Sequence, residues 1–177
     1  MNPLVHAELG WLAAQRLRAR KDRVLVTLAG VAPDLDGLSL LAGQEAYARW
    51  HHVVAHGLPA ALLLCGLLAW RAEDKRGTFL FGLATFHLHL ACDLAGSGDF
   101  ALGGSGWPVL YLWPLSRAEL SWSGQWDLVS WQNTLIGLGA TIACLLTALR
   151  WNRTAVELFS TSADAAVVRA VRARFRR

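Results

Sequence analysis

Residues 133–149 contain no acidic or basic side chain, and this apolar stretch limits the possible folds more than any other feature of the sequence. An apolar helix of about 20 residues is long enough to cross a bilayer. Four more apolar helical segments are predicted, at residues 3–20, 23–31, 47–70 and 77–94. The chain is 54% hydrophobic and only 17% charged, against about a quarter charged in soluble domains. The sequence therefore predicts an all-α protein, an antiparallel bundle of about five core helices that is associated with a membrane.

Proline and glycine predict where these helices end. Pro33 should end the second segment, because proline disfavours helix in the residue before it, although residues 34–42 can resume as a short helix. Pro59 should kink the third segment. Residues 95–130 are rich in Trp and Gly and predict a long loop or lid. We expect residues 1–150 to form one helical domain and residues 151–177 a basic tail helix.

The basic residues fall in three clusters, at residues 16–23, 71–76 and 150–177. If the helices alternate in direction, all three clusters lie at one end of the bundle, as the positive-inside rule expects of cytoplasmic loops. A soluble antiparallel bundle with a basic end is the alternative. Basic clusters can also bind nucleic acid, but no helix-turn-helix or aromatic-interleaved pattern supports that partner. The lipid bilayer is the expected partner. The three cysteines have no paired spacing and predict neither disulfides nor a cysteine-ligated zinc site.

All six histidines and several aspartates are predicted to gather at the opposite end of the bundle. At about 1.5 Å per helical residue, His89 stands about 20 Å along its helix from the basic end. The same reasoning brings together residues that are far apart in the sequence. The set comprises His6, Asp34, Asp36, His51, His52, His56, His87, His89 and Asp93.

Spacing within this set indicates which side chains share a face. His89 and Asp93 are four residues apart, so both can bind one metal ion or bridge two ions through the carboxylate. His52 and His56 form a second such pair on a regular helix. Asp34 and Asp36 project the same way if the backbone is extended there, or either can cap a helix. Carboxylate and imidazole ligands suit Zn, Mn or Fe better than Mg or Ca.

The motifs occur in the order seen in a known family. They are His6, Pro33-Asp34-Leu35-Asp36, the pair His51 and His56, His89-Leu90-Ala91-Cys92-Asp93, and Trp113-Pro114. This set resembles bacterial inner-membrane metal-dependent hydrolases, the LexA-binding, inner-membrane-associated family. That family's second motif usually reads His-Arg-x-x-Thr-His-Ser, and here the Arg, Thr and Ser are absent. A more distant similarity is to zinc-dependent phospholipase C, an all-helical scaffold with His and Asp zinc ligands.

The resemblance implies one to three divalent ions, most simply zinc, and a location in the inner membrane. It favours His51 over His52 as a ligand. Asp36 is a further ligand or the general base, and Arg117, with Arg49, can hold an anionic substrate. His52 and His87 are expected to orient ligands. The implied ligands are His6, Asp34, Asp36, His51, His56, His89 and Asp93.

These features predict a membrane-bound hydrolase that uses metal-activated water on a phosphoester or a lipid-like substrate. Because the site lies away from the basic clusters, it is expected to face the non-cytoplasmic side. Two alternatives stay open. In the first, the protein has no enzymatic activity and the metal only holds helices together. In the second, the protein is a transporter whose histidines and aspartates relay protons or metal ions.

Overall fold

The computed structural model describes residues 1–100, 104 and 106–175, in which seven α-helices are joined by turns and one long connection. The helices are α1 (Pro3–Ala13), α2 (Arg20–Val31), α3 (Gln44–Trp50), α4 (Leu58–Arg71), α5 (Lys75–Gly96), α6 (Trp131–Trp151) and α7 (Thr161–Phe175). Three 3-10 segments accompany them: η1 (Ala14–Arg16), η2 (Ala32–Ala42) and η4 (Ala155–Leu158). The described residues contain isolated β-bridges but no strand. The all-α prediction is confirmed.

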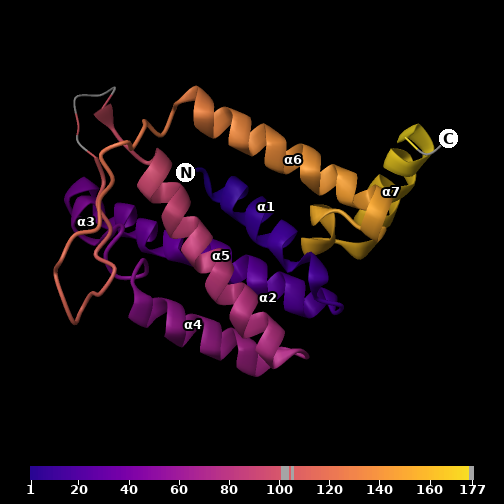
Figure 1. Ribbon diagram of the computed structural model, residues 1–177, viewed down its shortest axis with the longest axis horizontal. Coiled ribbons are helices and arrows are strands. Elements are labelled where there is room, and N and C mark those ends of the chain that lie inside the picture. Colours follow the sequence, from indigo (N-terminus) through magenta and orange to yellow (C-terminus); the bar gives the residue numbers. More distant parts are fainter. Residues whose placement is uncertain (101–103, 105, 176–177) are drawn as a thin grey trace.

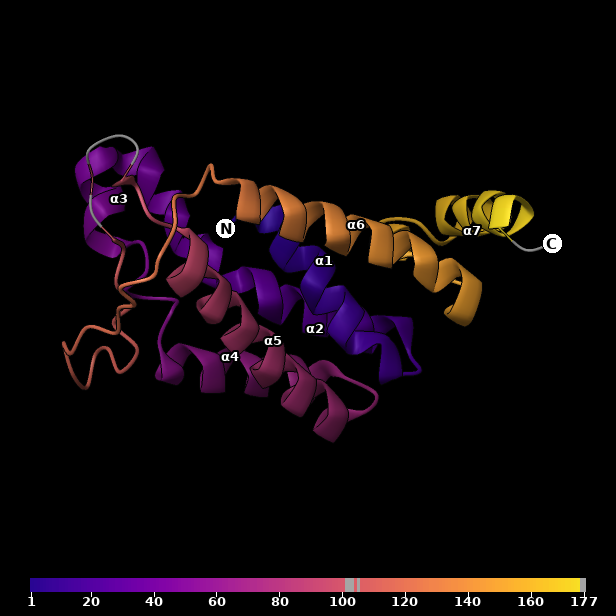
Figure 2. The ribbon, with the colours of Figure 1, turned by 45° about the horizontal axis from the view of Figure 1, so that its top comes forward.

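The long helices form a row in which helices consecutive along the chain run in opposite directions, whereas two packed pairs, α2 with α5 and α1 with α6, run parallel (Figure 1). Helix α2 packs against both α1 and α5, while α4 packs on α5 and α6 packs on α1. Figure 2 shows the same order from a second angle, with α6 along one side of the row and α4 along the other. Helix α7 crosses the far end of α6. This arrangement is the predicted antiparallel bundle with a C-terminal helix.

Small residues let the central helices approach closely. A Cβ atom built on Gly30 of α2 would lie 3.5 Å from the Cα of Gly10 in α1 and 3.4 Å from the Cβ of Thr85 in α5. Thr85 also donates its hydroxyl to the carbonyl of Val26 across the interface. Glycine at such a contact allows backbones to pack at short range, which is typical of helix pairs in membranes. The three helices that carry His6, His89 and the Asp34 segment are thus held together.

The prediction of one kinked helix over residues 47–70 is wrong. The segment is divided into α3 and α4, and residues 51–57 between them form an irregular turn. Pro59 lies in the first turn of α4, where its missing N–H is not needed, so it starts a helix instead of kinking one. Helix α3 ends at Trp50, His51 after it is extended, and His52 has a φ of 64°, a left-handed conformation outside regular helix. The regular-helix argument for His52 and His56 therefore does not apply.

The predicted segment over residues 3–20 is also wrong at its end, because α1 ends at Ala13 and only the short η1 follows before α2 begins at Arg20. The remaining boundaries agree more closely with expectation. Helix α2 ends just before the Ala32-Pro33 step, and the chain continues as η2 through residue 42. Helices α5 and α6 include the predicted segments at 77–94 and 131–150 and extend beyond them by one or two residues. The connection over 97–130 lies at the site end of the row, and part of the expected lid, residues 101–103 and 105, lies outside the described residues.

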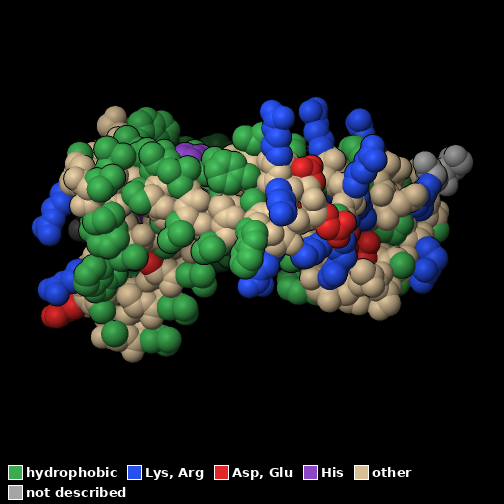
Figure 3. Space-filling model, turned by 90° about the horizontal axis from the view of Figure 1, so that it is seen from below, with side chains coloured by type: hydrophobic (Ala, Val, Ile, Leu, Met, Phe, Trp, Pro, Cys, Tyr) green, Lys and Arg blue, Asp and Glu red, His purple; other side chains and the backbone are tan. Residues whose placement is uncertain are grey.

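Three helical segments are long and apolar enough to cross a membrane: residues 20–42, 75–96 and 131–151. Helix α4 is apolar but shorter. Figure 3 shows the basic side chains gathered over the half of the molecule that holds α7, while hydrophobic side chains cover most of the other half. The predicted separation between a basic end and the histidine end is therefore present.

Candidate metal centre

Four elements bring their His and Asp side chains to one buried point. His6 comes from α1, Asp34 from η2, and His89 and Asp93 from α5, one helical turn apart. Their ligand atoms lie within 4.8 Å of one another. His52 and His56, from the turn before α4, form a second group of the same kind with Asp93. Because the two groups share Asp93, the cluster resembles a site for more than one cation.

Hydrogen bonds on the outer side of the rings fix where two of the histidines carry their protons. Nδ1 of His89 lies 2.8 Å from the carbonyl oxygen of Gly30, which only accepts, so Nδ1 carries the proton. Nδ1 of His56 likewise donates to Oδ2 of Asp36 at 2.9 Å. In both rings this leaves Nε2 as a lone pair that is directed into the cluster. Metal-ligating histidines are held in this way by a carbonyl or a carboxylate.

The lone pairs in the cluster face one another instead of facing donors. Nε2 of His89 lies 3.3 Å from Nε2 of His56 and 2.9 Å from Oδ2 of Asp93. Nε2 of His56 is 3.5 Å from the same carboxylate oxygen. In their unprotonated form, three acceptors at these distances repel one another unless a proton or a metal ion lies among them. The residues therefore fit a bound metal ion.

Buried polar atoms without a hydrogen-bond partner also indicate that the cluster fits a bound ion. Both ring nitrogens of His6, Nδ1 of His52, and one carboxylate oxygen each of Asp34 and Asp93 are buried without a hydrogen bond. Buried polar atoms in folded proteins normally have a partner, and an ion is one explanation when they do not. That so many occur within one cluster indicates a ligand that the protein side chains themselves do not supply.

The cluster attracts positive charge. Burial alone would lower the pKa of His56, but the hydrogen bonds and charges of Asp36 and Asp93 outweigh it and raise the pKa to about 9. His52 differs, since burial together with the charge of His56 lowers its pKa to about 2 and keeps its ring neutral. A neutral imidazole is the form that binds a metal. A proton on His56 and a metal ion thus compete for the same place.

Asp36 supports the ligands from outside. Oδ1 accepts from Nδ1 of His51 at 2.7 Å, and Oδ2 accepts from His56 and from the backbone N–H of Ala55 at 3.3 Å. Both oxygens are therefore occupied, which fits orientation of His56 better than direct metal binding. Asp34 and Asp36 do not project the same way, since the backbone between them is a 3-10 helix and not extended.

His51 belongs to neither metal group among the described residues. Its ring stacks on Tyr47, with 4.5 Å between the ring centroids, and meets Trp107 edge-on at 5.2 Å. The structure thus brings His52 into the cluster and leaves His51 beside it, hydrogen-bonded to Asp36. The resemblance favoured His51 over His52 as a metal ligand, and this assignment of His51 stays a prediction.

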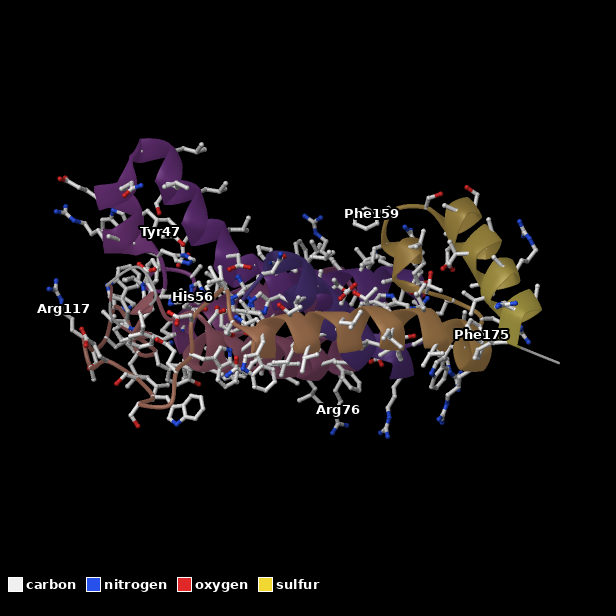
Figure 4. All side chains as sticks on the ribbon, turned by 90° about the horizontal axis from the view of Figure 1, so that it is seen from above. Tyr47, His56, Arg76, Arg117, Phe159 and Phe175 are labelled. Carbon is white, nitrogen blue, oxygen red and sulfur yellow. The ribbon has the colours of Figure 1, made fainter. Side chains whose placement is uncertain are left out.

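Other predicted site residues lie away from the cluster. His87 donates from Nδ1 to the carbonyl of Leu83, and its Nε2 lies 2.8 Å from the hydroxyl of Tyr111, so it orients no ligand. Arg49 is exposed on α3. Arg117 is exposed at the outer edge of the long connection and points away from His56 (Figure 4). In this conformation neither arginine reaches a substrate at the cluster.

Some contacts could not be expected from the motifs. The amino group of Met1 donates to Oδ1 of Asp93 at 2.5 Å and to Ser97 at 2.9 Å. Ser97 in turn donates to Asp93, four residues earlier in the chain. A spacing of four residues on a helix could have predicted the contact of Ser97 with Asp93. The same spacing could have predicted the contact of Tyr47 with His51. The contact between Trp107 and His51 had no such signal.

The cluster opens into a cavity of about 630 Å³ at the same end of the molecule. Asp34, His51, His52 and Asp93 form part of its wall. Tyr47 and Trp107 stand on the same wall, and Figure 4 shows Tyr47 and His56 at this end, remote from Arg76. The cation site thus faces a space large enough for a small molecule.

The family model described as YdjM inner membrane protein matches residues 1–174, which is nearly the whole chain. No curated protein and no solved structure matches the chain.

Proposed function

The chain belongs to the YdjM inner membrane protein family, and we propose that it is a membrane-bound, metal-dependent hydrolase of phosphoester or related polar-headed substrates. The observation that carries this proposal is the contact between the cluster and the cavity. The lone pairs of His56, His89 and Asp93 converge on one point, and Asp34, His52 and Asp93 also border open space.

Each residue has a role in this proposal. His6, Asp34, His89 and Asp93 hold one cation, and His52 and His56 hold a second with Asp93. Zinc suits these ligands best, with manganese or iron as the other choices. A bound divalent ion supplies activated water and stabilises the negative charge of the transition state. Asp36 orients His56 and His51, while Tyr47 and Trp107 keep the ring of His51 at the cavity wall.

The cavity favours hydrolysis over a structural metal. In a structural metal site, protein ligands enclose the ion and leave no coordination position for water. Here three of the ligand residues border a cavity of about 630 Å³. A transporter is less well supported, because buried apolar side chains such as Val26 of α2 and Phe86 of α5 lie between the cluster and the basic end.

The charge distribution supports an orientation. The clusters at residues 16–23, 71–76 and 150–175 lie at the end away from the metal centre. By the positive-inside rule this end is cytoplasmic. We therefore place the metal centre at the non-cytoplasmic face of the inner membrane.

Turnover by the purified, zinc-loaded protein tests the proposal. We expect hydrolysis of at least one class among phosphomonoesters, phosphodiesters and carboxylic esters, with loss of activity on chelation and recovery when zinc is returned. Activity that survives complete chelation would contradict a metal-dependent mechanism. Tightly bound metal without turnover of any class would favour the structural site.

Replacing Asp36 by asparagine should weaken the site without removing a ligand of either group. The amide cannot accept from both His51 and His56 as the carboxylate does, so His56 loses its fixed orientation. We expect the affinity for zinc to fall by about 10–100-fold, the range typical of residues that orient metal ligands. Competition with a zinc chelator measures this. Glu45→Gln, an exposed carboxylate on α3, is the matched control and should leave the affinity unchanged.

A further inference from the structure

The cavity extends well beyond the metal groups, into the space between α1 and α6. Its polar lining comes from the cluster, Ser97, Asn2, Asn133 and Thr134. Apolar or small residues from both helices and from the chain before α6 also line it, namely Pro3, Val5, Leu128, Val129 and Gly137. The cavity therefore combines groups that can bind a cation and its anionic ligands with apolar surface that suits hydrocarbon.

The apolar walls include side chains that are strongly exposed. Leu128 is 51% exposed and Val129 is 84% exposed. Exposed apolar side chains at the rim of a cavity mark a surface that meets a lipid or an apolar ligand. Helix α6, which follows directly, is one of the segments that can cross a membrane. The rim thus lies beside the start of a segment that can cross a membrane.

The depth of the cavity supports the same conclusion. Gly137 stands six residues after the start of α6, which corresponds to about 9 Å along the helix axis. A Cβ atom at Gly137 would meet the side chain of Val5 in α1 at 3.1 Å, so α1 and α6 approach closely there, and both residues line the cavity. Gly139, two residues later, has no atom within 4 Å of such a Cβ and does not line the cavity.

We propose that the substrate is an amphiphile: its phosphoester head group lies at the metal groups and one aliphatic chain lies between α1 and α6, along Val5, Val129 and Gly137. This inference rests on the proposed function and names the substrate class for that same site. The amphiphile enters sideways from the bilayer, past Leu128 and Val129. A water-soluble phosphoester would use only the polar lining and would leave the apolar surface without a role.

Two non-hydrolysable probes separate the head group from the chain. Ethylphosphonate and dodecylphosphonate share the anionic head and differ in the chain. A competition assay measures how tightly each phosphonate binds to the zinc-loaded protein in lipid nanodiscs. The zinc content of every variant is measured as well. Gly137→Phe places a ring in the chain path. Thr134→Phe obstructs the same path one turn earlier, from an exposed side chain that does not press on α1. Gly139→Phe is the matched control.

We expect Gly137→Phe and Thr134→Phe to weaken binding of dodecylphosphonate by at least about tenfold, as steric exclusion from an apolar pocket does. In Thr134→Phe, binding of ethylphosphonate and the zinc content should not change, and Gly139→Phe should behave as the wild type. Gly137→Phe presses on Val5, next to His6, so its binding is compared at matched zinc content. Equal affinity of all variants for dodecylphosphonate, with zinc retained, would overturn the amphiphile while leaving the hydrolase proposal in place. A wild type that holds no zinc and binds neither phosphonate would overturn both.

Discussion

Asp93→Asn is expected to remove the metal and the activity together. Asp93 is the residue shared by both metal groups, and its oxygens lie near His6, His56 and His89. The amide has no negative charge and one acceptor oxygen instead of two. Loss of a shared ligand should exceed the effect of losing a supporting residue, so we expect a fall of at least about 100-fold in zinc affinity and in turnover.

Metal analysis and the chelation-sensitive turnover assay check this result on the same preparation. Glu45→Gln serves as the control for loss of a carboxylate at this end of the molecule. Helical content by circular dichroism separates loss of the site from loss of the fold. An Asp93→Asn protein that keeps both its zinc and its turnover would show that the cluster is not the catalytic centre.

Glu157→Ala is expected to cause the largest loss of stability, at the opposite end of the molecule. Glu157 of η4 accepts from Nε of Arg23 at 2.6 Å, from Nη2 of Arg23 at 2.6 Å, and from the indole of Trp11 at 2.8 Å. Arg23 and Glu157 are both buried. Removing one partner leaves the other charge buried and unpaired, which costs about 3–5 kcal/mol. Unfolding in detergent measures the change.

Two further variants show whether the buried pair is responsible. Arg23→Met combined with Glu157→Leu should recover most of the lost stability, because replacing both charges leaves neither one unpaired. Glu119→Gln, at an exposed carboxylate, should change stability by less than about 0.5 kcal/mol. If the double variant is as unstable as Glu157→Ala, the loss has another cause.

The pKa of Glu157 gives the expected pH dependence of this contribution. Burial would raise it, but the hydrogen bonds from Arg23 and Trp11 and the charge of Arg23 outweigh burial and hold the pKa below its ordinary value. A carboxylate with a lowered pKa contributes stability above the pKa of the unfolded chain, about 4.3. That contribution is lost as the pH falls through the lower folded value. The wild type should therefore lose this advantage over Glu157→Ala only in acid.

The bundle could be predicted from the sequence because its signals are local. The apolar segments, the gathering of the basic clusters at one end and the His89–Asp93 spacing all follow from helical geometry. The convergence of His6, Asp34, His56, His89 and Asp93 also follows, since each is separated from a basic cluster by a helix and so lies toward the opposite end. These residues belong to the groups that the structure brings together.

What could not be predicted depends on irregular backbone and long-range contacts. The turn at residues 51–57 makes His52, and not His51, a member of the second group, and no periodic pattern describes a turn with a positive φ. The 3-10 geometry of η2 directs Asp36 toward His51 and His56 instead of the metal position. The partners of Arg117 and His87 depend on how the long connection folds, and neither helical spacing nor composition specifies that path.

The metal content of the purified wild-type protein tests the central claim most directly. The facing lone pairs of His56, His89 and Asp93 and the unpartnered nitrogens of His6 predict at least one tightly bound zinc, manganese or iron ion per chain. Elemental analysis after purification without added metal, and again after reconstitution with zinc, provides the measurement. At least one ion per chain in the reconstituted protein is the expected result. A wild-type protein that is folded and holds no stoichiometric metal after reconstitution would contradict the account.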